Sequence, residues 1–410
     1  MKIVRTICRI LIGLVFIYSG FVKGVDPIGF AYKFHDYFMA FHMNYFQFLA
    51  MPLAVFFPAA EFLIGVSLIL GLRIKIASWA LLLFMSFFTI LTFILALFNP
   101  VSDCGCFGDA IILTNWQTFF KNVILFVPTL VIFFSRNKNK NNEKNVEEWL
   151  ILLIVLSGFL FVVNYCLNHL PIIDFRPYKV GTDIVRDMSR PAGAEQDSFK
   201  TMLSYRKDGT LKEFSLENIP WKDTTWKWVE TRVIKVKEGY RPPIHDFSIK
   251  SFEGNDITNE VLADHDFTFL LIARDISKTN IKAYDRANSI AKYCKTGHCK
   301  FYALTSSSQA EIDSLKKSRD LVFDFFITDG TTLKTINRAN PGLMLIKDGT
   351  ILAQWHYNDF PHPTEFGDNL MAYVLSIASG NERNLTGWLM VFILLFALLA
   401  FKIYQVKTDR

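Results

Sequence analysis

The run Ser102-Asp103-Cys104-Gly105-Cys106-Phe107-Gly108-Asp109 directly follows a long apolar block at residues 76–98. Two cysteines separated by a single glycine form a candidate redox pair. Whether such a pair is oxidised depends on its compartment, because disulfides persist in oxidising compartments and thiols are kept reduced in the cytosol. If the apolar block crosses a membrane, the side on which it ends therefore decides how the pair can act.

The chain is too apolar for a purely soluble protein, since 51% of its 410 residues are hydrophobic, only 20% are charged, and the hydrophobic residues lie in blocks. A helix needs about 20 apolar residues to cross a bilayer. We interpret the first apolar block, at about residues 4–22, as a span and not as a signal peptide. The sequence Ser19-Gly20-Phe21-Val22-Lys23 at its end offers no small-residue cleavage site. We predict an α-helical membrane bundle of six transmembrane helices, at about 4–22, 49–71, 76–98, 117–135, 149–168 and 387–404.

Lysine and arginine residues indicate the orientation, because short cytoplasmic loops carry an excess of them. They gather in the N-terminal segment, the turn after the second block, the loop after the fourth block and the C-terminal tail, which all fall on one side. We therefore predict an inner (cytoplasmic) membrane protein with both termini cytoplasmic, and with the Cys-Gly-Cys loop and residues 170–386 periplasmic. The lipid bilayer is then the first partner, and the formal charge of +6 reflects topology and not a nucleic-acid partner.

Residues 180–240 show the pattern of short strands. The turn Lys207-Asp208-Gly209-Thr210 separates two strand-like runs at 202–205 and 211–214, which predicts a hairpin. A further run at 226–234 partly alternates its large side chains. We interpret this alternation as one face of a half-buried sheet, with a ligand platform as the alternative.

From residue 244 onward, strands and helices alternate. Crossover helices between apolar strands indicate a sheet with a parallel portion. The strands are predicted at 267–273, 301–305, 323–328, 343–346 and 351–355, and the helices at about 278–295, 309–318 and 364–378. This order resembles the thioredoxin-like fold. The resemblance implies that Pro341, which precedes the final hairpin, is the commonly cis proline of that fold and shapes a recognition surface.

The paired cysteines of thioredoxin-like proteins would fall just after the first long strand, where this chain has residues 274–279 and no cysteine. The domain cannot perform dithiol exchange there, because the reaction needs a thiolate. Cys294 and Cys299 bracket a helix-to-strand turn instead. A structural disulfide is the favoured reading outside the cytoplasm. A redox pair assisted by His298, or a metal site with a distant fourth ligand, stays open.

The N-terminal region carries a second resemblance. The sequence from Ile17 to Lys33, Glu61 in the second block, Gly71 at its end and Cys-Gly-Cys-Phe-Gly after the third block resemble the DoxX and methylamine-utilisation MauE group of four-helix membrane proteins. The resemblance covers about residues 1–136. It implies a membrane role in disulfide formation or electron transfer beside a thioredoxin-like partner, which here is fused to the same chain.

The chemistry of Cys104 and Cys106 can also be argued directly. A disulfide across one residue closes a small ring, and Gly105 relieves part of its strain because it has no β-carbon. Strained disulfides are more readily reduced, which favours a pair that cycles over a structural disulfide or capture of a soft metal such as copper(I). Asp103 and Asp109 are expected to raise the thiol pKa unless Lys121, Lys23 or Lys33 comes close.

Glu61 is predicted to face the interior of the bundle, because a carboxylate inside an apolar block is costly. It either makes a helix-packing hydrogen bond or takes part in proton relay or quinone contact. Arg9 is its partner only if it lies at the same depth, and is expected to reach the cytoplasmic surface instead. The aromatic segment 26–46 is expected to form an amphipathic helix at the outer interface, as an anchor, as a lid over the cysteine pair or as a contact for a quinone head group.

These observations divide the chain into five parts. We predict a four-helix membrane domain at residues 1–138 and a basic linker with the fifth span at 139–170. A β extension at 171–243, a thioredoxin-like α/β domain at 244–382, and a sixth span with its tail at 383–410 follow. The leading hypothesis is a membrane thiol-disulfide oxidoreductase or electron-transfer component acting on envelope proteins through Cys104 and Cys106, for which a quinone is a reasonable acceptor. The alternative is a non-catalytic scaffold whose thioredoxin-like domain binds an envelope protein. Neither a metal nor a phosphate-binding motif is predicted as part of the site.

Overall fold

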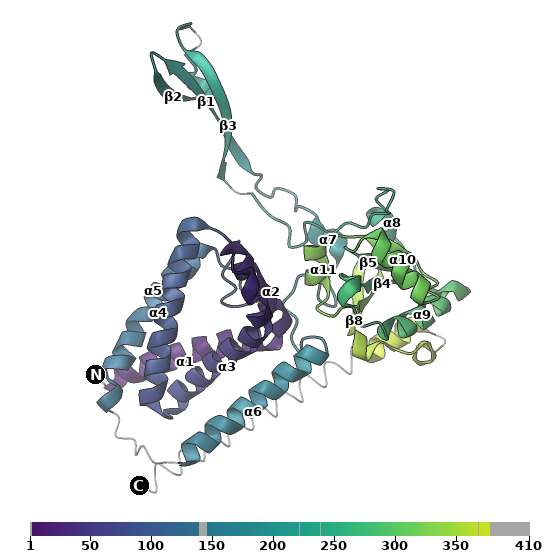
Figure 1. Ribbon diagram of the computed structural model, residues 1–410, viewed down its shortest axis with the longest axis horizontal. Helices are drawn as coiled ribbons and strands as arrows, with labels where there is room; N and C mark the ends of the chain where they lie inside the picture. Colours follow the sequence, from purple (N-terminus) through teal and green to yellow (C-terminus); the bar gives the residue numbers. More distant parts are fainter. Residues whose placement is uncertain (1, 139–145, 221, 238, 368, 378–410) are drawn as a thin grey trace.

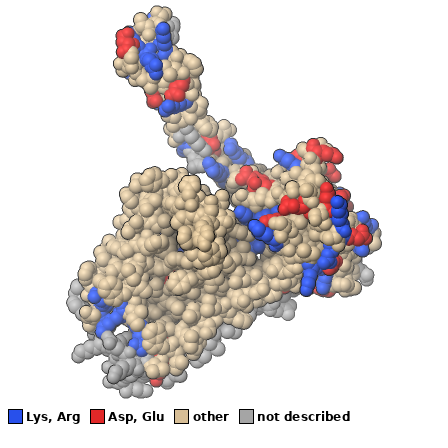
Figure 2. All heavy atoms as spheres, in the orientation of Figure 1, with Lys and Arg blue, Asp and Glu red and all other residues tan. Residues whose placement is uncertain are grey.

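The computed structural model describes residues 2–138, 146–220, 222–237, 239–367 and 369–377. It consists of a helical bundle, a mixed α/β domain beside one end of that bundle, and a three-stranded sheet that projects away from both (Figure 1). Figure 2 shows that the side of the bundle in view is almost free of charged residues, whereas the α/β domain and the projecting sheet carry many. Such an uncharged surface is typical of a membrane-embedded bundle.

Five helices of the described chain are long and apolar enough to cross a membrane. They agree with the first five predicted spans to within a few residues. The bundle helices are α1 (Lys2–Val25), α3 (Ala50–Leu70), α4 (Ile74–Phe98), α5 (Asn115–Phe134) and α6 (Val146–Asn168). The sixth predicted span, at 387–404, lies outside the described residues.

Helices α1 and α3 pack closely because glycines lie at their crossing. A β-carbon on Gly65 would come within 2.7 Å of the carbonyl oxygen of Gly13, and one on Gly20 would come within 2.6 Å of that of Pro58. Small residues permit such close approach between membrane helices. The loop-facing end of α1 and the middle of α3 are thereby held side by side.

Basic residues gather at the end of the bundle away from the α/β domain, which Figure 2 shows as a blue patch. Arg9 donates hydrogen bonds of 2.9 and 2.8 Å to the carbonyl oxygen of Leu68 near the end of α3. Arg73 lies 3.3 Å from the carboxylate of Glu148 at the start of α6. Arg9, near the start of the chain, and Arg73, in the turn after α3, thus lie at the same end of the bundle.

Helix α2 (Pro27–Ala40) and the short helix η1 (Asn44–Leu49) connect α1 to α3 at the opposite end. Asp26 caps α2 by accepting a hydrogen bond of 2.9 Å from the backbone N–H of Gly29. One face of α2 is buried through Phe30 and Phe38. The predicted aromatic helix in this segment is therefore present, and it packs on the bundle.

The projecting sheet comprises β1 (Ser198–Lys207), β2 (Thr210–Ser215) and β3 (Lys227–Lys237), in the antiparallel order β2-β1-β3. Asp208 and Gly209 both have positive φ angles, as a two-residue hairpin turn requires. The hairpin is the one predicted from sequence. The predicted half-buried face is found only in part. Trp226 packs on Phe214 at a centroid distance of 5.2 Å, whereas Trp228 and Val233 are 58% and 64% exposed. Within the described part of the chain, no second layer covers the sheet.

The α/β domain is built on a five-stranded sheet with the order β6-β5-β4-β7-β8. Strands β4, β5 and β6 are parallel, and β7 and β8 form an antiparallel hairpin beside β4. The strands are β4 (Thr268–Ile272), β5 (Lys300–Thr305), β6 (Phe325–Ile327), β7 (Gly342–Lys347) and β8 (Thr350–His356). This is the arrangement that the thioredoxin-like resemblance led us to expect.

Two hydrophobic clusters cover the two faces of this sheet. Phe269 and Leu271 of β4 belong to one cluster, and Leu270 and Ile272 belong to the other, because successive strand residues point to opposite faces. Ile184 of α7 lies in the second cluster, so residues from before position 244 also contribute to the core. The helices of this region are α7 (Ile184–Met188), α8 (Thr258–Leu262), α9 (Ala283–Tyr293), α10 (Gln309–Ser318) and α11 (Gly330–Ile336), and residues 370–377 are helical as well.

Candidate functional site

The Cys-Gly-Cys loop connects α4 to α5, and its two ends are tied together. Asn115, the first residue of α5, donates side-chain hydrogen bonds of 2.7 Å to the side chain of Asn99 and of 2.8 Å to the carbonyl oxygen of Val101. Thr114 and Gln117 form a capping box at the start of α5. These contacts give the loop a defined position at the end of the bundle.

Cys104 and Cys106 are both free thiols whose sulfur atoms lie 3.1 Å apart. Gly105 between them adopts a φ of +65°, in the left-handed region that favours glycine. Its N–H donates a hydrogen bond of 2.9 Å to the carboxylate of Asp103. The side chain of Cys104 is buried, whereas that of Cys106 is half-buried and is the more accessible of the two.

The two acidic residues that flank the cysteines are each paired with a cation. Lys33 of α2 lies 2.6 Å from Asp103, and Arg338 of the α/β domain lies 2.6 Å from Asp109. Lys33 does come close to the loop, but its partner is the carboxylate of Asp103 and not a thiol. Because both carboxylates are neutralised, their influence on the thiols is small.

The two thiols differ strongly in acidity. The hydrogen bond from Cys104 and the charges of Lys121 and Lys23 lower the pKa of Cys106 to about 6, although its burial acts in the opposite direction. The same hydrogen bond, together with burial, raises the pKa of Cys104 well above its usual value. At neutral pH, Cys106 is therefore the thiolate and Cys104 is the thiol that donates to it.

Glu61 is buried in the bundle and paired with Lys23 of α1. The Lys23 Nζ lies 2.6 and 2.8 Å from the two carboxylate oxygens, and both side chains are about 95% buried. The hydroxyl of Ser19 lies 2.9 Å from Glu61 Oε2 and 2.8 Å from the carbonyl oxygen of Cys106. Glu61 thus faces the interior, as predicted, and Ser19 connects it to the cysteine loop.

Arg9 is not the partner of Glu61, because its guanidinium binds the backbone of Leu68 instead. From the sequence, Lys23 was expected only as a possible neighbour of the thiols. Its spacing of four residues from Ser19 was the signal that could have placed both side chains on one face of α1, toward Glu61.

A cavity of about 270 Å³ lies between the helices beside the cysteine loop. Its walls are mainly apolar and aromatic, and include Phe34, Phe57 and Phe88. Its polar lining comes from Tyr37, Asn122 and the groups described above, which are Ser19, Lys23, Glu61, Lys121 and the Cys104-Gly105-Cys106 segment. The reactive sulfurs therefore adjoin an apolar space inside the membrane region.

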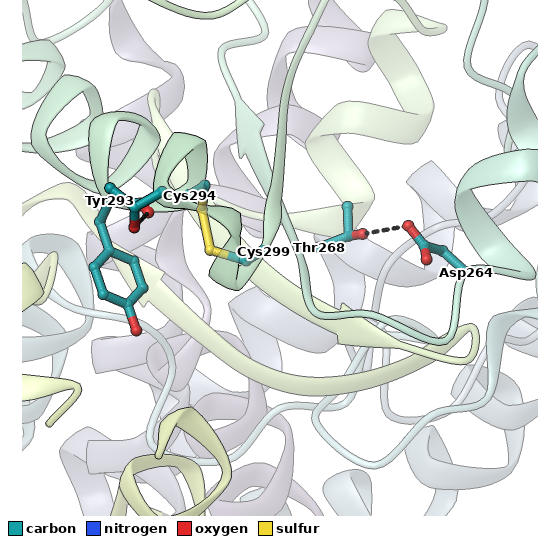
Figure 3. The surroundings of a disulfide bond; sticks show 6 residues. Asp264, Thr268, Tyr293, Cys294 and Cys299 are labelled. Carbon is teal, nitrogen blue, oxygen red and sulfur yellow. Dashed lines mark hydrogen bonds between the residues drawn. A yellow bond between two sulfur atoms is a disulfide. The ribbon is translucent and has the colours of Figure 1, made fainter. Parts of the chain in front are cut away.

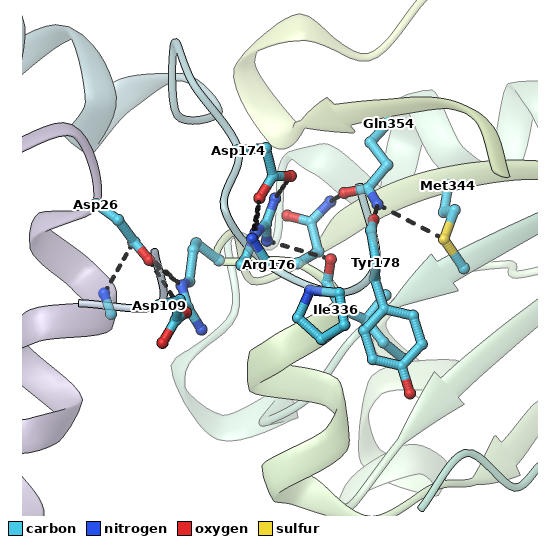
Figure 4. A network of polar contacts seen from close by, with 12 residues as sticks. Asp26, Asp109, Asp174, Arg176, Tyr178, Ile336, Met344 and Gln354 are labelled. Carbon is cyan, nitrogen blue, oxygen red and sulfur yellow. Dashed lines mark hydrogen bonds and ion pairs between the residues drawn. The ribbon is translucent and has the colours of Figure 1, made fainter. Parts of the chain in front are cut away.

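The α/β domain is joined to the membrane region through α2 and the cysteine loop. Figure 4 shows Asp26 and Asp109 side by side at this junction. Arg338 is 7% exposed, and its guanidinium binds both carboxylates, at 2.7 Å from Asp26 and 2.6 Å from Asp109. Close by, Arg176 pairs with Asp174 at 2.6 Å on the segment that leads from α6 into the α/β domain.

The loop after β4, at residues 274–279, faces this junction. Arg274, which follows β4 at that position, hydrogen-bonds the hydroxyl of Tyr32 on α2. The peptide bond between Asn340 and Pro341 is cis, and the Asn340 side chain donates a hydrogen bond of 2.7 Å to the carbonyl oxygen of Asp275. The cis-proline segment and the cysteine-free loop are thus adjacent, and this surface packs against α2.

Cys294 and Cys299 form a disulfide at the end of α9, with their Cα atoms 4.5 Å apart (Figure 3). Cys294 belongs to the core of the α/β domain, and the disulfide closes the turn that leads into β5. No group of three or more His, Cys, Asp or Glu side chains suited to a metal ion occurs among the described residues. The dithiol in this part of the chain is therefore held in its oxidised form, within a folded core.

Comparisons with known proteins match separate parts of the chain. Residues 1–135 match the family model "Methylamine utilisation protein MauE", and residues 199–238 match a "Domain of unknown function (DUF8463)". No curated protein matches the chain. A solution structure of "a putative protein disulfide isomerase from Bacteroides thetaiotaomicron" aligns with 32% of this chain and 84% of its own at 14% identity and a TM-score of 0.24. The fold of the α/β domain is therefore assigned from its strand order.

The chain is accordingly a membrane protein with a MauE-like region of apolar helices and a mixed α/β domain. The MauE match covers the four helices that enclose the cysteine loop and the buried ion pair. A membrane role in redox or disulfide chemistry is consistent with this combination.

Proposed function

We propose that the protein is a membrane thiol-disulfide oxidoreductase that acts on envelope proteins through Cys104 and Cys106. The observation that carries the proposal is the geometry of this pair, with sulfur atoms 3.1 Å apart and thiols of opposite pKa shift. A thiolate that is accessible at neutral pH attacks a disulfide, and a neighbouring thiol then resolves the mixed disulfide.

In this reaction Cys106 is the residue that exchanges with the substrate. In the oxidising direction, a substrate thiolate attacks Cys106 Sγ, the bond to Cys104 breaks, and Cys104 takes up a proton. A second substrate thiol then displaces Cys106, so that the substrate gains one disulfide and the loop becomes a dithiol. The half-buried position of Cys106 and the burial of Cys104 support this order.

The proposal includes an orientation in the inner membrane. The basic end of the bundle is cytoplasmic, according to the distribution of lysine and arginine. The cysteine loop, α2 and residues 170–386 are then periplasmic, where disulfides persist. The disulfide between Cys294 and Cys299 in the α/β domain supports this assignment.

The α/β domain has a positioning role in this proposal. It lacks cysteines at residues 274–279, and that surface packs against α2. Arg338 reaches Asp109, which lies only three residues after Cys106. The domain therefore holds the cysteine loop and its surroundings in place, while the thiol chemistry occurs in the membrane region.

Trapping experiments test the proposal. Full-length protein in membranes is treated with an alkylating reagent before and after mild reduction, and mixed disulfides with other proteins are followed in Cys104→Ser, whose Cys106 lacks its resolving thiol. In the wild type, we expect the alkylation of Cys104 and Cys106 to change on reduction. In Cys104→Ser, we expect mixed disulfides to accumulate. Cys166→Ser, which removes an isolated buried cysteine of α6, is the matched control and is expected to behave as the wild type. A pair that never changes redox state would contradict the proposal.

A scaffold that binds an envelope protein is the second candidate function, and the buried junction around Arg338 favours it. An arginine that binds two carboxylates from the membrane region ties the two parts into one surface. In a scaffold, the Cys104→Ser/Cys106→Ser double variant retains full function, whereas loss of Arg338 impairs it. An oxidoreductase loses its function in the Cys104→Ser/Cys106→Ser double variant.

A further inference from the structure

The cavity beside the cysteine loop combines features that a redox partner of the dithiol would need. It is about 270 Å³ in volume, close to the lower end of the range of roughly 300 to 1,000 Å³ for small-molecule sites. Phe57 stacks on Phe34 at a centroid distance of 5.7 Å and contacts Phe88 edge-to-face at 5.6 Å. These rings form an aromatic wall of the kind that accommodates a flat, apolar ring.

The polar end of the cavity carries donors. Lys23 is 4% exposed, and its ammonium group lies against Glu61. Charged side chains at this depth in a bundle are costly, so a buried pair that lines a cavity points to a function there. Lys121, whose ammonium group lies 4.4 Å from the centre of the Phe107 ring, also lines the cavity. Both cations can donate to a ligand oxygen.

The cavity wall extends to the outer surface of the bundle. Phe87 of α4 and Met43, just before η1, both line the cavity, and they are 56% and 40% exposed. The described part of this surface is apolar and belongs to the membrane region. Side chains that line the cavity thus also face the bilayer, which is the side from which a lipid-soluble ligand would enter.

We propose that this cavity binds the head group of a quinone, the lipid-soluble oxidant that takes electrons from the Cys104–Cys106 dithiol. The inference deepens the proposed function and rests on it. A quinone fits because it has a flat apolar ring for the aromatic wall, carbonyl oxygens for Lys23 and Lys121, and a tail that stays in the bilayer. Cys104, Gly105 and Cys106 line the same cavity, so the reacting sulfurs adjoin the ring.

The step balances without a further reactant. The sulfur–sulfur bond forms between Cys104 and Cys106, and the two electrons released reduce the quinone ring. The two carbonyl oxygens take up two protons. One proton comes from the Cys104 thiol. The other comes from the Lys23 ammonium group, which then takes up a proton from water. That proton replaces the one that Cys106 released to water when it became a thiolate. The products are a disulfide and a hydroquinone.

Glu61 is a positioning residue in this scheme, because it holds the Lys23 ammonium at 2.6 Å. Glu61→Gln keeps the shape of the side chain but removes the charge that holds the Lys23 ammonium group in place. We expect this variant to slow quinone reduction by a larger factor than it slows thiol exchange with a soluble disulfide. A merely structural role would change both reactions together.

Binding and reduction are tested separately on the full-length protein in lipid nanodiscs. The probe is a dimethoxy-methyl-benzoquinone with one isoprenoid unit, and the control ligand is the alcohol of the same tail without the ring. Binding is measured with the Cys104→Ser/Cys106→Ser variant, which cannot reduce the probe. We expect this variant to bind the quinone and to bind the tail alcohol much more weakly.

Two leucines of α4 provide a matched pair of variants. Leu91 lines the cavity, whereas Leu97 is 53% exposed on the same helix and lines no part of it. Leu91→Trp is expected to fill the cavity and weaken quinone binding at least tenfold, and Leu97→Trp is expected to leave it unchanged. Lys23→Gln is a second, smaller change, with about tenfold weaker binding expected from loss of a charge-assisted hydrogen bond.

The outcomes separate the two proposals. Equal binding of the quinone and the tail alcohol, or equal effects of the two leucine variants, would overturn the quinone site. If the dithiol is oxidised by a soluble disulfide but never by the quinone, the quinone site is refuted and the oxidoreductase function stands. If the dithiol never changes redox state although the quinone binds as expected, the proposed function is refuted and the binding site stands.

Discussion

The acidity of Cys106 is the property of the site that can be measured most directly. Its pKa of about 6 makes about 90% of Cys106 a thiolate at pH 7, compared with about 3% for a cysteine of ordinary pKa near 8.5. The largest cause of the low value is the hydrogen bond from Cys104, and the charge of Lys121 contributes less. Cys104→Ala and Lys121→Gln therefore remove the two causes one at a time.

The expected shifts follow from the strength of each interaction. A hydrogen bond to a charged group contributes about 1.5 to 3 kcal/mol, and one pKa unit corresponds to about 1.4 kcal/mol. Cys104→Ala is therefore expected to raise the pKa of Cys106 by about 1 to 2 units. Lys121→Gln is expected to raise it by a smaller amount.

The assay is the rate of alkylation of Cys106 between pH 4.5 and 9.5, in reduced full-length protein in nanodiscs, with the modified peptide identified by mass spectrometry. The midpoint of the pH profile is the informative quantity, because the intrinsic nucleophilicity of a thiolate falls as its pKa falls. Lys316→Gln, on α10 of the α/β domain, is the control for removal of a lysine charge. A wild-type midpoint near 8.5, or a larger shift in Lys121→Gln than in Cys104→Ala, would refute the assignment of Cys106 as the thiolate.

Three further predictions concern the junction, the α/β domain and the loop. Arg338→Gln leaves two acidic partners at the junction without their cation and is expected to cost about 3 kcal/mol, measured as a lower thermal midpoint and faster proteolysis between the two parts of the chain. Burial lowers the pKa of His356 to about 4, so its neutral form is native, and the α/β domain is expected to lose up to about 3 kcal/mol as the pH falls from 6.5 to 4. Thermal unfolding of His356→Gln over this range is expected to depend less on pH. Gly105→Ala places a β-carbon on a left-handed residue, 3.0 Å from Lys33, and is expected to cost about 1 kcal/mol and to increase hydrogen exchange in the cysteine loop.

Each of these predictions has a clear contrary result. An unchanged thermal midpoint in Arg338→Gln would show that the junction contributes little to stability. An equal pH dependence in wild type and His356→Gln would assign the acid sensitivity to other groups. Full protection of the loop in Gly105→Ala would show that the left-handed conformation of this residue is not required.

The helical membrane region and the α/β domain were predictable because their signals are local. Blocks of about 20 apolar residues define helices that cross a bilayer, and strands of the kind seen at Thr268–Ile272 are continuous apolar runs. The hairpin turn at Asp208 and Gly209 was predictable for the same reason, since two adjacent residues determine the turn. The exposure of the sheet that contains it was not, because burial depends on whether another layer packs against it.

The chemistry of the candidate site was only partly predictable. The types and spacing of Cys104 and Cys106 indicated a redox pair, and the depth of Glu61 in an apolar block indicated an interior carboxylate. Their partners are distant in sequence: Glu61 pairs with Lys23, 38 residues away, and Asp109 pairs with Arg338, 229 residues away. A pKa depends on such neighbours. The flanking carboxylates were expected to raise the pKa of the thiols, but only the tertiary structure shows that both carboxylates are paired with cations.

The sequence by itself determined that this is a membrane protein with a cysteine pair at the end of an apolar helix and an α/β domain without cysteines at residues 274–279, because composition, periodicity and residue type are properties of short segments. Only the tertiary structure decided that Cys106 is the acidic thiol, that Lys23 accompanies Glu61, and that an apolar cavity adjoins the pair. Charges and cavities are made by side chains from several helices, and their effect depends on distance in space and not along the chain.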